Sequence, residues 1–329
     1  MIVLGIDTSC DDTGVGIATD GRVLANVVVS QTALHARFGG VVPEEASREH
    51  LDVIDDAVNR ALTQAGVDLA DVGAVAATYG PGLVGALLVG LSYAKTLAWG
   101  LDVPLVPVHH LEGHLAAAGA EPPFLALIAS GGHTALFNVS SWSQIEELGH
   151  SRDDAAGEAF DKVARLLGLG YPGGAALSAL AATGDDHGVN LPWPMQGNDA
   201  IEFSFSGLKT AVALLLQRRP DAEPADVAAT FERIAIGSLV EVTLRAVERT
   251  GVKRLVVAGG VAANRLLRSA FDDAGLEVSF PPPHLATDNG AMIALAAGRR
   301  LVDADARAQL AAAASIDAVP YQPFTGPSA

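Results

Sequence analysis

The chain is poor in cysteine and in aromatic residues. A single cysteine, Cys10, among 329 residues excludes an internal disulfide framework and fits a reducing compartment, so we expect a cytoplasmic protein. Aromatic residues make up 5% of the chain although 50% of it is hydrophobic, and cores of small apolar side chains are typical of closely packed α/β layers. A chain of this length predicts two domains that fold without disulfides.

Basic residues are also scarce. The sequence has 21 Lys and Arg against 38 Asp and Glu, which gives a formal net charge of −17. Nucleic-acid binding over the whole surface is therefore excluded, because phosphate contacts need concentrated positive charge. A nucleic-acid substrate would require a local basic patch or a basic partner protein.

No long uninterrupted hydrophobic run is present. The longest apolar stretch, residues 83–108, contains Lys95, Asp102 and two prolines, so it predicts a buried helix followed by a strand. The first residues have no basic leader, and Asp7 interrupts their apolar run. We therefore expect neither a signal peptide nor a membrane partner.

The order of short apolar runs indicates a duplication. Three strand-like runs open the chain and three more open its second half, each set followed by helices and further strands. This plan is that of the actin-like ATPase (ASKHA) fold, an α/β fold of two duplicated domains with the nucleotide and metal site between them. We expect residues 1–120 plus about 290–329 in the first domain and residues 121–289 in the second. The runs are residues 3–6, 14–19 and 22–30, and then 124–130, 134–139 and 144–148.

Two histidines stand four residues apart in His110-Leu-Glu-Gly-His114. On a helix, this spacing places both imidazoles on one side, where they could bind one metal ion. The pattern is not that of a metalloprotease, because residue 111 is Leu and Glu112 falls on another face. Without further ligands, two partly buried polar residues beside the core are an equally good interpretation.

Two glycine-rich turns follow predicted strands. In Ser130-Gly131-Gly132-His133 the glycines would let backbone N–H groups approach a phosphate or an oxyanion, although an ordinary hairpin turn has the same composition. The second turn begins at Gly259-Gly260 and opens a helix that we expect over residues 262–274, with Asn264 in its first turn. A turn at a helix N-terminus suits contacts to a nucleoside.

Carboxylates gather at the first turn of the chain and before its last predicted helix. The segment between the first two strands contains Asp7, Asp11 and Asp12, and carboxylates beside phosphate require a metal or backbone N–H groups. A solvated acidic turn is the alternative. For Asp288, in Thr287-Asp288-Asn289-Gly290, helix capping and metal ligation are rival roles.

Together these motifs resemble the TsaD/Gcp family, the tRNA N6-adenosine threonylcarbamoyltransferases, in order over nearly the whole chain. The resemblance is carried by the opening Gly-Ile-Asp-Thr-Ser-Cys-Asp-Asp-Thr, Lys95-Thr96, Leu101-Asp-Val-Pro104, His110 to Leu115, Ser130 to Thr134, Gly157 to Lys162, Tyr171 to Gly174, Phe203 to Lys209, Gly259 to Asn264 and Thr287 to Gly290.

The resemblance implies a metal-assisted acyltransferase. It implies transfer of the threonylcarbamoyl group from threonylcarbamoyl-AMP to N6 of adenosine 37 in tRNAs that read ANN codons. His110, His114 and Asp288 would hold one divalent metal, iron(II) in the first place and zinc as the alternative. ATP or threonylcarbamoyl-AMP would contact Ala129, Ser130, Gly131, Gly132, His133, Asp161, Gly174, Ser178 and Asn264.

The resemblance also implies partners, namely tRNA, a paralogous actin-like subunit of the TsaB type and a small ATPase of the TsaE type. We take Asp11 as the candidate catalytic base. The chain departs from the family pattern at Ala175, where Pro is common, and at Asp12, where Glu is common. Three rival functions are a small-molecule kinase of the same fold, a glycoprotease and a catalytically silent scaffold.

Overall fold

The structure, a computed structural model, describes residues 1–38, 40–142, 144–170, 172–302, 315–321 and 324. The chain forms two compact units. The first comprises Met1–Pro122, Ser140–Glu146 and Pro281–Ala329, and the second Pro123–Val139 and Glu147–Phe280. The domain boundaries expected from the sequence stay a prediction; they assign residues 121–122, 140–146 and 281–289 differently from these units.

The first sheet has five strands in the order β3-β2-β1-β4-β5. The expected three-stranded opening is present, because β1 pairs antiparallel with β2 and β2 with β3, whereas β4 runs parallel to β1 and β5 parallel to β4. These strands are β1 (Ile2–Asp7), β2 (Asp12–Thr19), β3 (Arg22–Ser30), β4 (Ala74–Gly80) and β5 (Leu105–His109).

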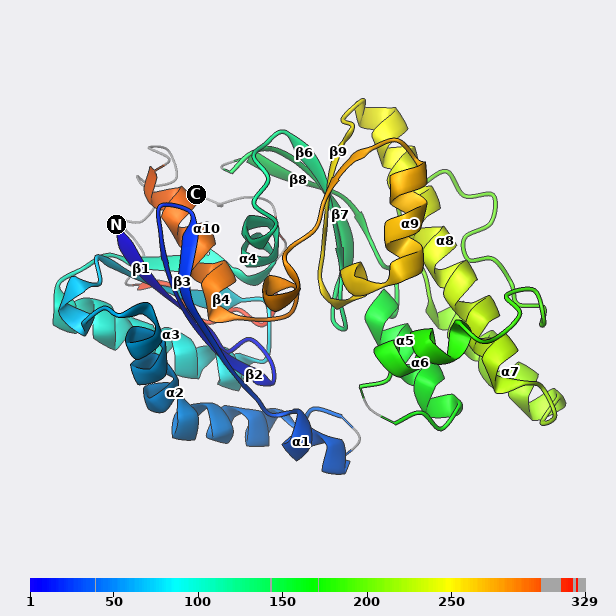
Figure 1. The fold of residues 1–329 in the computed structure, drawn as a ribbon, viewed down its shortest axis with the longest axis horizontal. Coiled ribbons are helices and arrows are strands. Elements are labelled where there is room, and N and C mark those ends of the chain that lie inside the picture. Colours follow the sequence, from blue (N-terminus) through cyan, green and yellow to red (C-terminus); the bar gives the residue numbers. More distant parts are fainter. Residues whose placement is uncertain (39, 143, 171, 303–314, 322–323, 325–329) are drawn as a thin grey trace. The chain divides into compact units, whose positions relative to one another are not determined.

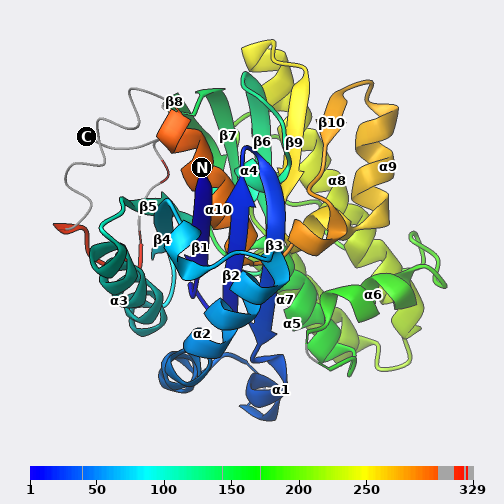
Figure 2. The same ribbon diagram turned by 60° about the vertical axis from the view of Figure 1, so that its left-hand side comes forward.

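Helices cover both faces of the first sheet (Figure 2). Leu4 and Ile6 of β1 pack in one cluster with apolar residues of α2 (Pro43–Ala65) and α3 (Val84–Leu101). Successive side chains of a strand point to opposite faces, so the residues between them face α10 (Gly290–Val302), which packs on β1, β2 and α4 (His110–Ala117). The last helix therefore lies on the first sheet, as the sequence predicted.

Glycines make the contact between α10 and the sheet. A Cβ at Gly16 would lie 2.2 Å from the backbone nitrogen of Ala291, and one at Gly290 would lie 2.4 Å from the backbone nitrogen of Gly16. Both distances are far below van der Waals contact, so any side chain would push the helix away from the strand. The first turn of α10 thus rests directly on backbone, which fixes the position of the segment that precedes it.

Among the described residues, α3 is the one helix that is long and apolar enough to cross a membrane, judged by length and composition alone. A third of this helix is buried in the structure. One face, which includes Leu87, Leu91 and Ala94, is buried in the core, whereas Trp99 at its end is 87% exposed. The helix packs against β4 and α2. A single such helix is also what the core of an α/β layer contains.

The second sheet repeats the topology of the first. Its order is β10-β9-β6-β7-β8, so β6, β7 and β8 correspond to β1, β2 and β3, and β9 and β10 to β4 and β5. The expected duplication is therefore present. The strands are β6 (Phe124–Ala129), β7 (Thr134–Ser141), β8 (Gln144–His150), β9 (Arg254–Ala258) and β10 (Glu277–Ser279).

Five helices accompany the second sheet among the described residues, and its core is built mainly from Leu, Val, Ala and Phe (Figure 1). The helix expected over 262–274 begins instead as a 3-10 turn, because Asn264 caps a separate helix through a bond from Leu267 N to its Oδ1. The helices are α5 (Ala156–Leu166), α6 (Gly174–Ala181), α7 (Ser206–Arg218), α8 (Pro224–Thr250) and α9 (Arg265–Asp273); the remaining helical turns are α1 (Thr32–His35), Ala36–Phe38, Leu69–Asp71, Gly260–Ala263 and Pro283–Leu285.

Candidate functional site

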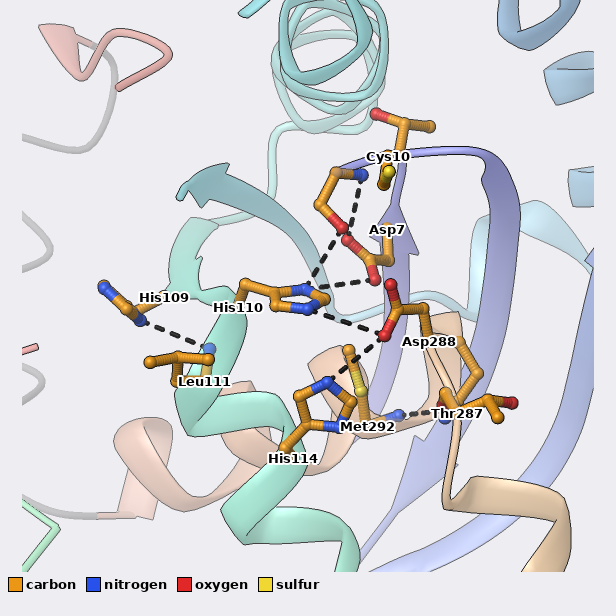
Figure 3. Close-up of polar contacts among 12 residues, drawn as sticks. Asp7, Cys10, His109, His110, Leu111, His114, Thr287, Asp288 and Met292 are labelled. Atoms are coloured by element: carbon orange, nitrogen blue, oxygen red, sulfur yellow. Dashed lines mark hydrogen bonds and ion pairs between the residues drawn. The ribbon is translucent and has the colours of Figure 1, made fainter. Parts of the chain in front are cut away.

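The two histidines of the sequence motif begin helix α4. The helix starts at His110 because His109 caps it, accepting a bond from Leu111 N at Nδ1 (3.2 Å). Every residue of α4 is buried. One helical turn separates His110 from His114, and their ring centroids lie 4.8 Å apart. The prediction that the two imidazoles share one side of a helix is confirmed (Figure 3).

Asp288 lies beside both imidazoles although it is distant in the sequence. Its Oδ1 is 3.2 Å from Nε2 of His114 and 3.6 Å from Nε2 of His110, as Figure 3 shows. The neighbouring Asn289 takes the capping role, because its Oδ1 accepts a bond from Met292 N (2.9 Å) in the first turn of α10. The structure thus assigns helix capping, one of the two rival roles for Asp288, to Asn289. Asp288 is left for the other role, metal ligation.

These three residues have the spacing of metal ligands. Two ligands about 2.1 Å from one ion in tetrahedral geometry stand about 3.4 Å apart, and the two nitrogen–oxygen distances to Asp288 are 3.2 Å and 3.6 Å. His114 is 1% exposed, and neither of its ring nitrogens forms a hydrogen bond with the described residues. A buried imidazole without hydrogen bonds is costly. A divalent metal bound by His110, His114 and Asp288 would give Nε2 of His114 a partner and so remove part of that cost.

Asp7 supports His110 from the side opposite to Asp288. Its Oδ2 lies 3.4 Å from His110 Nδ1, and the hydroxyl of Ser9 lies 3.2 Å from the same nitrogen. A carboxylate at Nδ1 holds the proton there and leaves Nε2 for a metal. Burial lowers the pKa of His110, but the carboxylates of Asp288 and Asp7 outweigh it and raise that pKa to about 9 in the metal-free chain.

Glu112, between the two histidines in the sequence, is paired with Arg300. Its Oε1 accepts from Arg300 Nε at 2.8 Å and its Oε2 accepts from Arg300 Nη2, while Arg300 Nη1 donates to Pro107 O. Glu112 is 1% exposed. Because both carboxylate oxygens are bound to a guanidinium, Glu112 is not available as the base of a metalloprotease.

Asp11, in the turn after β1, and Asp12, the first residue of β2, belong to the same unit as the histidines. Both aspartates are half-buried. The backbone carbonyl of Asp11 accepts from Gln31 N at 3.0 Å. Burial raises the pKa of Asp12 to about 6, and the nearby carboxylates of Asp11, Asp288 and Asp7 act in the same direction. Burial likewise raises the pKa of the Cys10 thiol. This accumulation of negative charge favours cation binding at the turn.

In the second unit, residues 129–133 form the turn from β6 to β7. Ser130 closes it, because its N donates to His133 O (2.8 Å) and its Oγ accepts from His133 N (3.0 Å). Ala129 is fully buried, whereas Gly131 and Gly132 are exposed. The N–H groups of these two glycines have no acceptor among the described residues. They are therefore available to an oxyanion.

Two further glycines hold this turn in place. A Cβ at Gly157, at the start of α5, would lie 2.6 Å from Ser130 O, which accepts a bond from Gly157 N (3.0 Å). A Cβ at Gly259 would lie 2.5 Å from Ala129 O, and the φ of Gly259 is +91°. The turn thus depends on backbone contacts that only glycine permits.

Asp161 and Gly174, both expected at the nucleotide, are brought together. Asp161 Oδ1 accepts from the backbone nitrogens of Gly173 (2.8 Å) and Gly174 (3.1 Å), so Asp161 ties α5 to the N-terminus of α6. Tyr171, which carries part of the family resemblance, lies outside the described residues. Ser178 and Asn264 also meet, with Asn264 Nδ2 donating to Ser178 Oγ at 3.2 Å.

Comparison with known proteins decides the family. The family model described as "TsaD: tRNA N6-adenosine threonylcarbamoyltransferase" matches residues 22–295. The chain belongs to the TsaD family. A tRNA N6-adenosine threonylcarbamoyltransferase of Thermus thermophilus is 57% identical over 303 residues, which cover 91% of this chain and 93% of the relative. The chain is thus a transferase, as the sequence predicted.

Solved structures agree on the fold of this TsaD-family chain. Full-length HypF in its phosphate- and nucleotide-bound form has a TM-score of 0.61 at 15% identity, covering 93% of this chain and 56% of that one. Component A of the (R)-2-hydroxyglutaryl-CoA dehydratase of Acidaminococcus fermentans has a TM-score of 0.56 at 19% identity, covering 92% and 100%. The predicted actin-like ATPase fold is confirmed.

Some residues of this site were missed by the sequence interpretation. The sequence places Asp7 among several carboxylates, but nothing in the spacing shows that it faces His110 Nδ1. Arg300 and Glu232 gave no local signal, because their partners, Glu112 and Asn264, are distant in the sequence. The sequence contains one hint of such a pair. Glu112 lies between the two histidines but on another face of the helix, so its carboxylate needs a different partner.

Proposed function

We propose that this chain transfers the threonylcarbamoyl group from threonylcarbamoyl-AMP to N6 of adenosine 37 in tRNAs that read ANN codons. The product is N6-threonylcarbamoyladenosine, and AMP is released. Membership of the TsaD family supports the transfer. The observation that carries the metal-assisted form of it is the approach of two buried imidazole nitrogens to one oxygen of Asp288.

Within this proposal His110, His114 and Asp288 hold one divalent ion. Iron(II) is the first choice and zinc the alternative, because two imidazoles and one carboxylate suit both. The chemistry that such an ion supplies is Lewis-acid neutralisation of negative charge on an acyl phosphate. Asp7 keeps His110 in the tautomer that presents Nε2 to the ion.

The second unit binds the nucleotide part of the donor. The exposed N–H groups of Gly131 and Gly132 donate to a phosphate or to the carbamoyl oxygen as it gains negative charge. Ser130, His133 and the buried Ala129 shape this turn. Asp161 holds Gly174 at the start of α6, and Ser178 and Asn264 contact the nucleoside.

In the reaction, N6 of the adenosine attacks the carbamoyl carbon. A nitrogen–carbon bond forms, the carbon–oxygen bond to the phosphate breaks and AMP leaves with the bonding electrons. Asp11 accepts the proton that N6 loses. An aromatic amine is a weak nucleophile, so holding the two reactants in contact contributes at least as much as this base.

The acidic surface makes partners part of the proposal. A chain with a net charge of −17 has little attraction for tRNA phosphates, so a TsaB-type actin-like subunit and a TsaE-type ATPase would supply part of the tRNA-binding surface. The lone Cys10 fits a cytoplasmic location.

The test is transfer of labelled threonine into tRNA with ATP, bicarbonate, the adenylate-forming enzyme and the partner proteins. We expect label in adenosine 37 with the wild-type chain and a loss of at least a hundredfold in a His110→Ala/His114→Ala variant. Elemental analysis should show that this variant has also lost its metal. His187→Ala removes a histidine whose side chain is 75% exposed and is the matched control.

Two outcomes would contradict the proposal. Absence of label with folded, metal-loaded wild-type chain would favour a scaffold or a small-molecule kinase. Full transfer by the metal-free double variant would retain the transferase and remove the metal from its mechanism.

A further inference from the structure

Three polar side chains meet in the second unit, each from a different element. Ser178 lies on α6, Glu232 on α8 and Asn264 at the start of α9. Ser178 Oγ donates to Glu232 Oε1 at 2.5 Å, and Asn264 Nδ2 donates to the same oxygen at 2.6 Å. All three residues are half-buried. Glu232 is thus the centre of the cluster, although neither its spacing nor the family resemblance assigned it a role.

The hydrogen bonds fix the orientation of the Asn264 amide. Its Oδ1 accepts from Leu267 N at 3.0 Å and caps α9, so Nδ2 must face Glu232 and Ser178. Nδ2 lies 2.6 Å from Glu232 Oε1 and 3.2 Å from Ser178 Oγ, and because these two oxygens are themselves 2.5 Å apart, one N–H of the amide serves both. The second N–H of the Asn264 amide has no acceptor among the described residues and remains for the nucleoside.

The hydroxyl proton of Ser178 is committed, because it is donated to Glu232 Oε1. Glu232 Oε2, in contrast, accepts no hydrogen bond from the described residues and is not among their buried polar atoms without a partner. Two donors thus hold Oε1 of the carboxylate and leave Oε2 open. The two bonds fix the orientation of the carboxylate, so that Oε2 is a positioned hydrogen-bond acceptor.

We propose that Glu232 binds the vicinal hydroxyls of the nucleotide's sugar through Oε2, with Ser178 and Asn264 as the residues that position it. The inference rests on the proposed nucleotide site of the second unit. An open carboxylate oxygen accepts hydrogen bonds from sugar hydroxyls, as acidic residues do in other nucleotide-binding proteins. It repels phosphate. The ligand group at this cluster is therefore the sugar, while the phosphates belong at the N–H groups of Gly131 and Gly132.

The test compares binding of radiolabelled ATP and 2′,3′-dideoxy-ATP by equilibrium dialysis, with magnesium, to the whole chain and its variants. The wild-type chain should bind ATP about tenfold or more tightly than the dideoxy nucleotide, since hydrogen bonds to charged groups are worth about that factor or more. Glu232→Ala should weaken ATP binding by the same factor and leave dideoxy-ATP binding unchanged. A merely structural role would weaken both nucleotides equally.

Two variants complete the design. Glu232→Gln keeps the length of the side chain and an acceptor for Ser178 and Asn264, so it should fold even if Glu232→Ala does not, and it should still lose part of the discrimination. Glu248→Gln changes the charge of an exposed position on the same helix and should keep the wild-type ratio.

The possible outcomes distinguish an error in the role of Glu232 from an error in the proposed nucleotide site. If the wild-type chain binds both nucleotides equally, or if Glu232→Gln keeps the full preference for ATP, the nucleotide site stands and the role of Glu232 is wrong. If the wild-type chain binds neither nucleotide, the proposed nucleotide site is itself wrong and the role of Glu232 falls with it.

Discussion

Arg300 of α10 and Glu112 of α4 are joined by two hydrogen bonds in the interior of the first unit. The pair connects the helix that carries His110 and His114 to the helix that follows Asp288. It therefore holds the helix that supplies both histidines against the helix that begins two residues after Asp288.

Substitution of Glu112 by Gln should destabilise the chain strongly. The guanidinium of Arg300 would stay buried without its counter-charge, and such a change costs about 3 kcal/mol or more. We expect a lower urea midpoint with an unchanged denaturant slope, and a weaker affinity for Zn²⁺ because α4 and α10 are less firmly held.

A neighbouring pair provides the control for this prediction. Arg299 and Glu121 are 3.0 Å apart, and the Glu121 side chain is 72% exposed, so Glu121→Gln should cost less than about 1 kcal/mol. Equal effects of the two substitutions would contradict the structural role assigned to Glu112.

Substitution of Asp7 by Asn should weaken metal binding. The amide keeps the size of the side chain but loses the charge that holds the proton on His110 Nδ1, and loss of such a partner typically lowers metal affinity about 10- to 100-fold. Titration with Co²⁺, followed by its visible absorption, measures both the affinity and the ligand geometry.

Asp20→Asn is the matched control, because the Asp20 side chain is 85% exposed and Asn tolerates its positive φ of 48°. An Asp7→Asn chain that binds Co²⁺ as tightly as the wild type would show that Asp7 does not support His110.

Metal affinity should increase with pH. The pKa of His110 is about 9 in the metal-free chain, where the carboxylates of Asp288 and Asp7 outweigh burial, so a metal must displace a proton at neutral pH. We expect affinity to rise up to about tenfold per pH unit between pH 7 and 9 and then to level off. Isothermal titration in two buffers of different ionisation enthalpy should show about one proton released per metal at pH 7.

The same pKa has a consequence for the metal-free chain. Its folded-state value lies above the ordinary histidine value, so the stabilisation is complete below about pH 6.5 and is lost as pH rises through about 9. Urea denaturation in the presence of a chelator measures this loss. A metal affinity and a stability that are both flat from pH 7 to 9 would show that His110 is already neutral.

Local signals in the sequence predicted much of the fold. Helix α2 runs from Pro43 to Ala65 and ends at Gly66 with φ of 67°, because proline suits the first turn and glycine the left-handed cap. The four-residue spacing of His110 and His114 likewise predicted their common side. Each of these signals depends on residues a few positions apart.

Long-range relationships could not be predicted in this way. Asp288 was tied to the histidines by family resemblance alone, and its spacing left capping open until Asn289 was found in that role. The pairing of Glu112 with Arg300 and the cluster around Glu232 join distant segments, and a pattern within one segment contains no record of such partners. The roles assigned to the individual site residues stay predictions.

The glycine contact between β2 and α10 also affects synthesis on the ribosome. Strands β1 and β2 are translated well before the helix that covers one of their faces, which begins at Gly290. Until that helix has been translated, the face of the sheet is uncovered and Asp288 cannot lie beside the histidines. In the nascent chain this face of the sheet is therefore exposed to chaperones, and a site built from His110, His114 and Asp288 can form only once α10 has been made.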